Sequence, residues 1–209
     1  MKKQPIGRSA LLVVDAQEGF KLGERWSRRS NAAFESNVGK LVRSWRDAGL
    51  PVFFILHTDP DPGFRPTDPQ FKLMDSIERL VNEPLLVKNT RNSFTSTDLQ
   101  QRLHALGVTR VVVCGIQTEQ CVETTTRVAA DLGYDVDFVT EATLTFPIRN
   151  AVTGEELGTD DIIRRTEFVL RDRFARIATV NDLTEELSET GRVLNGEGRP
   201  THQQNDARS

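Results

Sequence analysis

The chain has 209 residues, a length that favours one globular domain. Its composition of 37% hydrophobic and 27% charged residues is typical of a soluble protein, and a net charge of -3 gives no broad electrostatic reason to bind nucleic acid or an acidic membrane. No run approaches the roughly 20 apolar residues of a membrane span, and the apolar stretch near the N-terminus is too short for a signal peptide. We therefore expect a cytoplasmic protein with neither nucleic acid nor membrane as a partner.

The chain contains two cysteines, Cys114 and Cys121, which are too few for a disulfide framework. Their separation is not one that zinc sites use. The three histidines are far apart in sequence, at His57, His104 and His202. We therefore expect no dedicated metal site and no cofactor.

Six apolar runs of strand length occur along the chain, at residues 11–14, 52–56, 85–87, 110–114, 136–139 and 176–180. Continuous apolar runs are typical of strands that are buried on both faces, as in a parallel sheet.

Helical patterns fall between most of these strands. We expect helices over residues 37–48, from the capping box at residues 97–100 to Gly107, from Thr118 to Leu132, and over residues 160–174. Four prolines mark a loop after the second strand, followed by a short helix near Asp75. Such alternation predicts an α/β fold, with a parallel sheet between layers of helices. Residues 1–189 are expected to form one domain, and residues 190–209 a disordered tail.

Three chemically capable side chains follow the predicted strands. Asp15 follows the first strand, Lys88 follows the third, and Cys121 lies six residues beyond Gly115 at the end of the fourth. Because the carboxyl ends of parallel strands meet at one edge of the sheet, we expect these groups to converge there.

If Thr118 is the N-cap of its helix, Cys121 lies in the first turn. Unpaired backbone N–H groups and the helix dipole would then lower the pKa of the thiol, and the thiolate is the reactive form. The same N–H groups could hold an oxyanion. The alternative is that Cys121 is a small core residue, which is the interpretation we give to Cys114 inside its apolar strand.

Asp15 and Lys88 suit the two remaining roles. A carboxylate beside a thiol can take its proton and later return it to a leaving amine, and an ammonium at a buried strand end needs an anion. The alternatives are that Asp15 caps the following turn and that Lys88 is a surface lysine whose stem lies along the sheet edge.

Four blocks of the sequence resemble the isochorismatase-like cysteine hydrolases. The blocks span residues 10–20, 88–99, 115–125 and 131–142, and the likeness extends over about residues 8–182. The resemblance implies a six-stranded parallel sheet in a three-layer α/β/α, Rossmann-like domain. It also implies a homodimer or homotetramer acting on a small-molecule substrate.

The same resemblance implies a catalytic triad of Cys121, Asp15 and Lys88. It further implies a cis peptide between Ile116 and Gln117, in a turn whose backbone N–H groups hold an oxyanion. Three more side chains would line the substrate pocket: Gln17, Phe20 and Phe94.

The chain departs from two branches of that family. Nicotinamidases carry a metal-binding Asp-x-His and a further His after strand two, an arrangement that residues 56–62 lack. Isochorismatases proper lack the cysteine.

Asn92-Ser93 stands where Ser-Ala is common in the family, which would alter the pocket. The connection over residues 146–161 is long, and it would cover either the site or a subunit interface.

We therefore expect a cysteine-dependent amidohydrolase that cleaves a C–N bond through a thioester. Carboxamides, N-carbamoyl amines, ureides and biuret-like compounds all remain open as substrates. The alternative is a non-catalytic binding or scaffold protein with the same fold. Haloacid-dehalogenase, phospho-receiver and dinucleotide-binding domains are disfavoured, because the Asp-x-Asp, the acceptor aspartate and the glycine-rich turn that they respectively need are missing.

Overall fold

The computed structural model describes residues 4–194, with side chains through residue 190. Its centre is a six-stranded sheet in the order β3-β2-β1-β4-β5-β8, in which every neighbouring pair is parallel. The strands are β1 (Ser9–Val14), β2 (Val52–His57), β3 (Leu85–Lys88), β4 (Arg110–Ile116), β5 (Asp135–Leu144) and β8 (Arg176–Ile177). The predicted fold class is confirmed.

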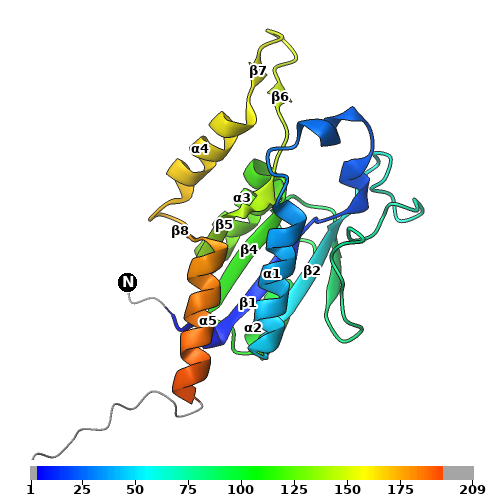
Figure 1. Cartoon of the computed structure of the whole chain (residues 1–209). Coiled ribbons are helices and arrows are strands. Elements are labelled where there is room, and N and C mark those ends of the chain that lie inside the picture. Colours follow the sequence, from blue (N-terminus) through cyan, green and yellow to red (C-terminus); the bar gives the residue numbers. More distant parts are fainter. Residues whose placement is uncertain (1–3, 195–209) are drawn as a thin grey trace, which may run out of the picture.

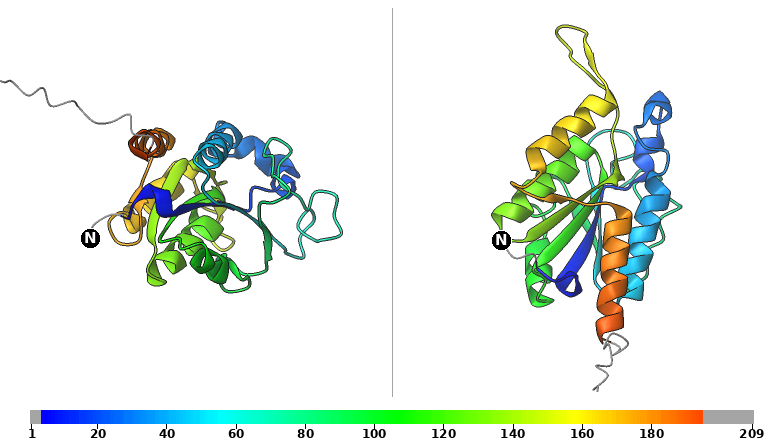
Figure 2. Two further views of the ribbon diagram at one scale, coloured as in Figure 1. Left: turned by 90° about the horizontal axis from the view of Figure 1, so that it is seen from below. Right: turned by 60° about the vertical axis from the view of Figure 1, so that its left-hand side comes forward.

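Helices cover both faces of the sheet (Figures 1 and 2). One face carries α1 (Phe34–Asp47) and α5 (Val180–Leu194), and the other carries α2 (Leu99–Ala105), α3 (Glu123–Asp131) and α4 (Thr159–Leu170). Shorter helical turns are η1 (Ile6–Arg8), η2 (Glu18–Lys21), η3 (Glu24–Arg28) and the π-helical η4 (Thr118–Val122). A hairpin of β6 (Ile148–Arg149) and β7 (Glu156–Leu157) stands out from the body in both figures.

The central strand β1 contributes to two separate cores. Leu11 and Val13 pack in the core beneath α1 and α5, whereas Leu12 and Val14 pack in the core on the opposite face. Side chains alternate between the faces of a strand, so a strand with helices on both sides has to be apolar throughout. The continuous apolar sequence of β1 is explained by this position.

Several elements differ from the sequence prediction. In β3 only alternate side chains are buried, because β3 is an edge strand with one open face. No helix forms over residues 58–84, which consist of turns and bends, so the helix expected near Asp75 is absent. An isolated antiparallel bridge pairs Leu73 of this segment with Gln17.

The end of the chain also differs. The last strand stops at Ile177, because α5 begins at Val180. That helix continues to Leu194, five residues into the expected tail, and residues 195–209 lie outside the described part of the chain.

Gly115 allows β4 to lie close to β1 just before Asp15. Its φ is +132°, and a Cβ built on it would lie 1.8 Å from the carbonyl oxygen of Val14, its partner in the strand register. Any side chain here would push apart the two strands whose ends carry the site residues.

We predict that Gly115→Ala lowers the free energy of unfolding by about 3 kcal/mol or more, because it adds a backbone clash to an unfavourable φ. Urea denaturation measures the loss. Gly133→Ala is the matched control: its φ is also positive, at +89°, but a Cβ there meets nothing within 4 Å. That variant should lose only about 1–2 kcal/mol. Equal losses in the two variants would contradict the close approach.

Candidate active site

Three side chains from distant parts of the sequence meet at the carboxyl edge of the sheet. Asp15 follows β1, Lys88 ends β3 and Cys121 lies in η4 after β4. Their exposed fractions are 1%, 0% and 5%, respectively. The structure therefore brings together the three residues that the sequence placed at one edge.

Lys88 lies at the centre of this group. Its Nζ donates to Asp15 Oδ2 at 2.8 Å, to Cys121 Sγ at 3.4 Å and to the carbonyl oxygen of Thr90 at 3.2 Å. His57 Nδ1 lies 3.3 Å from the same nitrogen. A fully buried ammonium is stable only where such partners replace water, so Lys88 is held by the site rather than exposed at the sheet edge.

Asp15 uses one carboxylate oxygen and leaves the other available. Oδ2 accepts from Lys88, whereas Oδ1 is buried with no hydrogen-bond partner among the described residues. Burial raises the pKa of this carboxyl above its ordinary value, and the charge and hydrogen bond of Lys88 oppose the shift, as does the neighbouring thiol of Cys121. The backbone at Asp15 has φ +53°, in the left-handed region that aspartate tolerates better than most residues.

The helix start around Cys121 differs from the prediction. Gln117, not Thr118, is the N-cap residue. The Thr118 hydroxyl donates to Thr143 Oγ1 at 2.8 Å instead of capping the helix. The first turn is π-helical, with the N–H of Val122 donating to the carbonyl oxygen of Gln117 at 3.2 Å.

The expected low pKa of the Cys121 thiol was wrong. Burial raises its pKa to about 12, and the negative charge of Asp15 acts in the same direction, while Lys88 opposes both. Desolvation of the buried sulfur raises the pKa most, and the position of Cys121 near a helix start does not reveal that burial. The resting thiol is therefore protonated at neutral pH.

His57 is a site residue that the sequence analysis missed. It ends β2, directly after the apolar run at residues 52–56, and that position was the signal available in the sequence. In the structure it is paired in register with Lys88 on β3. Its Nε2 lies 3.0 Å from Arg91 Nη1 and 3.5 Å from Asp59 Oδ2. Burial and the charge of Lys88 lower the pKa of the imidazole, so the ring is neutral at neutral pH and its Nδ1 can accept from Lys88.

Gln17 holds the end of β2 instead of lining the cavity. Its Nε2 donates to the carbonyl oxygen of His57 at 3.1 Å, and its Oε1 accepts from the His57 N–H at 2.6 Å. Both groups are fully buried, so Gln17 fixes the backbone that carries the imidazole.

A cavity of about 250 Å³ opens next to the thiol. Pockets for drug-sized ligands span roughly 300–1,000 Å³, so this cavity suits a smaller molecule. It is lined by Asp15, Phe20, Arg25, His57, Asp59, Asp61, Phe64, Arg91, Gln117, Gln120 and Cys121.

The remaining predicted site residues are distributed differently. Phe20 and Gln117 line the cavity. The peptide between Ile116 and Gln117 is cis, and the Ile116 side chain lies in the core beneath α1 and α5. Phe94 does not line the cavity: it stacks on Tyr134, with ring centroids 6.2 Å apart, and packs in the opposite core.

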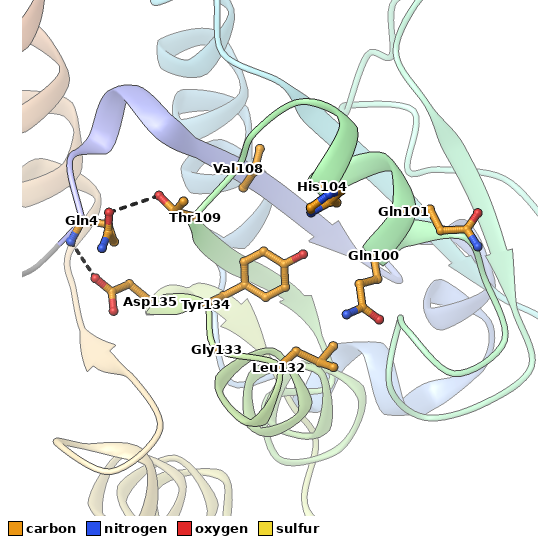
Figure 3. Close-up of a pocket in the computed structure, with 10 residues that line it drawn as sticks. All are labelled: Gln4, Gln100, Gln101, His104, Val108, Thr109, Leu132, Gly133, Tyr134 and Asp135. Atoms are coloured by element: carbon orange, nitrogen blue, oxygen red, sulfur yellow. Dashed lines mark hydrogen bonds between the residues drawn. The ribbon is translucent and has the colours of Figure 1, made fainter.

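A larger cavity of about 550 Å³ lies at the opposite edge of the sheet (Figure 3). It is formed around the beginnings of β4 and β5, between α2 and the end of α3, and includes His104 and Tyr134. None of the three converging residues borders it, so the chemistry belongs to the smaller cavity.

Among the described residues, no group of three or more His, Cys, Asp or Glu side chains could hold a metal ion. Over the same residues, no helix combines the length and apolar character that crossing a membrane requires.

The six-stranded parallel sheet, its flanking helices and the polar site at its carboxyl edge define a three-layer α/β/α hydrolase fold. The chain belongs to the isochorismatase family of hydrolases, because residues 9–157 match the Isochorismatase domain.

Relatives in sequence agree with this assignment. The isochorismatase family protein YrdC of Bacillus subtilis (strain 168) is 32% identical over 88% of this chain and 98% of its own length. Nicotinamidase 3 of Arabidopsis thaliana is 32% identical over 69% of this chain and 78% of its own length. A streptothricin hydrolase of Streptomyces noursei is 35% identical, and the match covers 66% of this chain and 50% of that protein.

A solved structure agrees as well. An isochorismatase-family protein from Chromobacterium violaceum ATCC 12472 superposes with a TM-score of 0.83 and 26% identity, covering 90% of this chain and 97% of that one.

The buried ion pair generates a prediction about stability. We expect Lys88→Met to lower the free energy of unfolding by about 3–5 kcal/mol at pH 7, because it leaves a buried carboxylate without its cation. The pKa of Asp15 is already raised in the folded state, and removing Lys88 raises it further. The loss should therefore grow as the pH rises above the raised pKa that Asp15 has in the wild type, and shrink at lower pH, where Asp15 is protonated in both proteins.

Urea denaturation at several pH values from 4 to 9 measures this loss. The double variant Asp15→Asn/Lys88→Met is the control, since it contains no lone buried charge and should recover much of the stability. A loss that does not change with pH, or no recovery in the double variant, would show that the pair does not act as described.

Proposed function

We propose that this protein hydrolyses the C–N bond of a small amide, N-carbamoyl or ureide compound through a thioester on Cys121. The observation that carries the proposal is the buried contact of Lys88 Nζ with both Asp15 Oδ2, at 2.8 Å, and Cys121 Sγ, at 3.4 Å, beside a small cavity. Similarity to a nicotinamidase and a streptothricin hydrolase supports hydrolysis of an amide.

The first half of the reaction forms the thioester. Asp15, through its free Oδ1, takes the proton of Cys121 as the sulfur bonds to the substrate carbonyl carbon. The carbonyl oxygen becomes an oxyanion, which N–H groups around Gln117 and Cys121 hold. Asp15 then gives the proton to the nitrogen, the C–N bond breaks, and ammonia or an amine leaves.

The second half returns the enzyme to its starting state. A water molecule loses a proton to Asp15 and adds to the thioester carbonyl. When the C–S bond breaks, the sulfur recovers that proton and the carboxylic or carbamic acid leaves. The Lys88 ammonium faces both the carboxylate and the sulfur, so it stabilises whichever of them carries the negative charge.

The high thiol pKa is compatible with this mechanism. The thiol does not lose its proton to solvent before substrate binds, because its pKa is about 12. Instead, the proton moves to an adjacent base as the new bond forms. The resting enzyme therefore needs Asp15 in its ionised form, because Asp15 is that base.

We expect Cys121→Ala to abolish ammonia release from a panel of small carboxamides and ureides, with a loss of roughly 10³-fold or more where wild type is active. Cys114→Ala is the control, since Cys114 is a core thiol whose Sγ donates to the carbonyl oxygen of Leu12 at 3.6 Å and does not line the cavity. It should retain activity. Substantial turnover by the Cys121 variant would overturn the thioester, and a wild type inactive on the whole panel would favour a binding protein.

The pH dependence of kcat/KM tests the proton assignment. The acid limb should reflect ionisation of Asp15 with an apparent pKa above 3.8, because burial raises that pKa. No fall is expected up to about pH 10, since the thiol pKa lies at about 12. A rate that instead climbs through pH 8–9 would show that the thiol must ionise into solvent first.

A further inference from the structure

Arg25 on η3 lines the active-site cavity from its exposed side, and its guanidinium lies against aromatic rings. Its Cζ is 5.1 Å from the ring centroid of Phe20, 5.2 Å from that of Phe146 and 6.0 Å from that of Phe64. Phe20 and Phe64 themselves meet edge to face at 4.9 Å. Contacts with several rings restrict the guanidinium without using its N–H donors.

The hydrogen-bonding capacity of Arg25 is unused. Among the described residues, no hydrogen bond or ion pair satisfies its guanidinium. Burial lowers the pKa of this guanidinium, and the charge of the Asp61 carboxylate opposes that shift. Its neighbours on the same segment differ. Arg28 forms two hydrogen bonds with Glu156, and Arg29 donates to the carbonyl oxygen of Trp26 at 3.0 Å.

Three other charged side chains at the cavity have close polar contacts. Arg91 and Asp59 both lie against the His57 ring, at 3.0 and 3.5 Å. At the inner end, the Asp15 carboxylate is paired with Lys88. Among the described residues, Arg25 is therefore the cavity arginine whose guanidinium has no close polar contact, and a planar guanidinium with five donors matches a carboxylate in two parallel hydrogen bonds.

We propose that Arg25 is a specificity residue that binds a carboxylate of the substrate, so that the substrate is a small amido acid or N-carbamoyl amino acid. This assignment rests on the proposed function. The carboxylate lies at the cavity mouth while the amide or ureide carbonyl faces Cys121, and the volume of about 250 Å³ limits the spacer between them to a few atoms.

Two isosteric pairs of compounds test this inference. N-carbamoylglycine is compared with isobutylurea, and succinamate with 4-methylpentanamide; in each pair an isopropyl group replaces the carboxylate. Wild type should favour the acid of each pair by at least about tenfold in kcat/KM. Arg25→Gln should lower kcat/KM for the acids by about 10- to 100-fold, mainly through KM, and change the neutral compounds by less than about threefold.

Arg28→Gln is the matched control. It makes the same change in charge on η3 but removes a guanidinium that binds Glu156 and does not line the cavity. It should leave the preference for acids intact. Equal losses for acids and neutral compounds in Arg25→Gln would assign Arg25 to the cavity wall alone, and a wild-type preference for the neutral compounds would overturn the inference while leaving the proposed function standing.

If no compound of either pair is hydrolysed, the proposed function is what has failed for these substrates, and a binding measurement decides the inference. Succinamate and N-carbamoylglycine are then titrated calorimetrically into Cys121→Ala and into Cys121→Ala/Arg25→Gln. Saturable binding that disappears in the double variant supports the carboxylate site. Absence of binding, or equal binding to both variants, overturns it.

Discussion

The contact between the Lys88 ammonium and the Asp15 carboxylate, buried and 2.8 Å long, is the constraint on which the site depends. Two charges without water cost more than they gain unless further polar groups surround them. Here those groups are the sulfur of Cys121, the ring of His57 and the carbonyl oxygen of Thr90. Replacing a buried ion pair by hydrocarbon is often neutral for a fold or stabilises it, so stability alone does not explain this pair, whereas the proposed reaction gives both residues a role.

The sheet provides the precision that this arrangement needs. Registered parallel strands place the ends of β1, β2 and β3 beside one another, with His57 directly opposite Lys88. Gly115 lets β4 approach the end of β1 without a side chain between them. Gln17, two residues after Asp15, holds the backbone of His57 with two hydrogen bonds. The reactive groups are thus positioned by strand register and buried hydrogen bonds rather than by a mobile loop.

Much of this could be predicted from the sequence. The apolar runs gave the six strands, and the rule that parallel strands end at one edge was enough to bring Asp15, Lys88 and Cys121 together. These arguments succeed because alternation and burial are set by residues that are close in sequence.

The missed features depend on three-dimensional surroundings. The pKa of Cys121 is raised by desolvation, which no local motif indicates. The Thr118 hydroxyl donates to Thr143 on β5 instead of capping its own helix. Gln17 was expected in the pocket but bonds to a backbone segment 40 residues away. Arg25 lies in a stretch without apolar periodicity, and only its contacts with Phe20, Phe64 and Phe146 reveal its position.

The central claim is that Cys121 carries the acyl group while Asp15 moves its proton. Intact-mass measurement after acid quenching, during turnover of an amide that releases ammonia, tests it most directly. We predict an adduct on Cys121 with the mass of the substrate minus ammonia, formed by wild type and lost in Asp15→Asn. Steady turnover with no adduct on any residue under rapid quenching, or an adduct formed at the wild-type rate without the Asp15 carboxylate, would contradict the account.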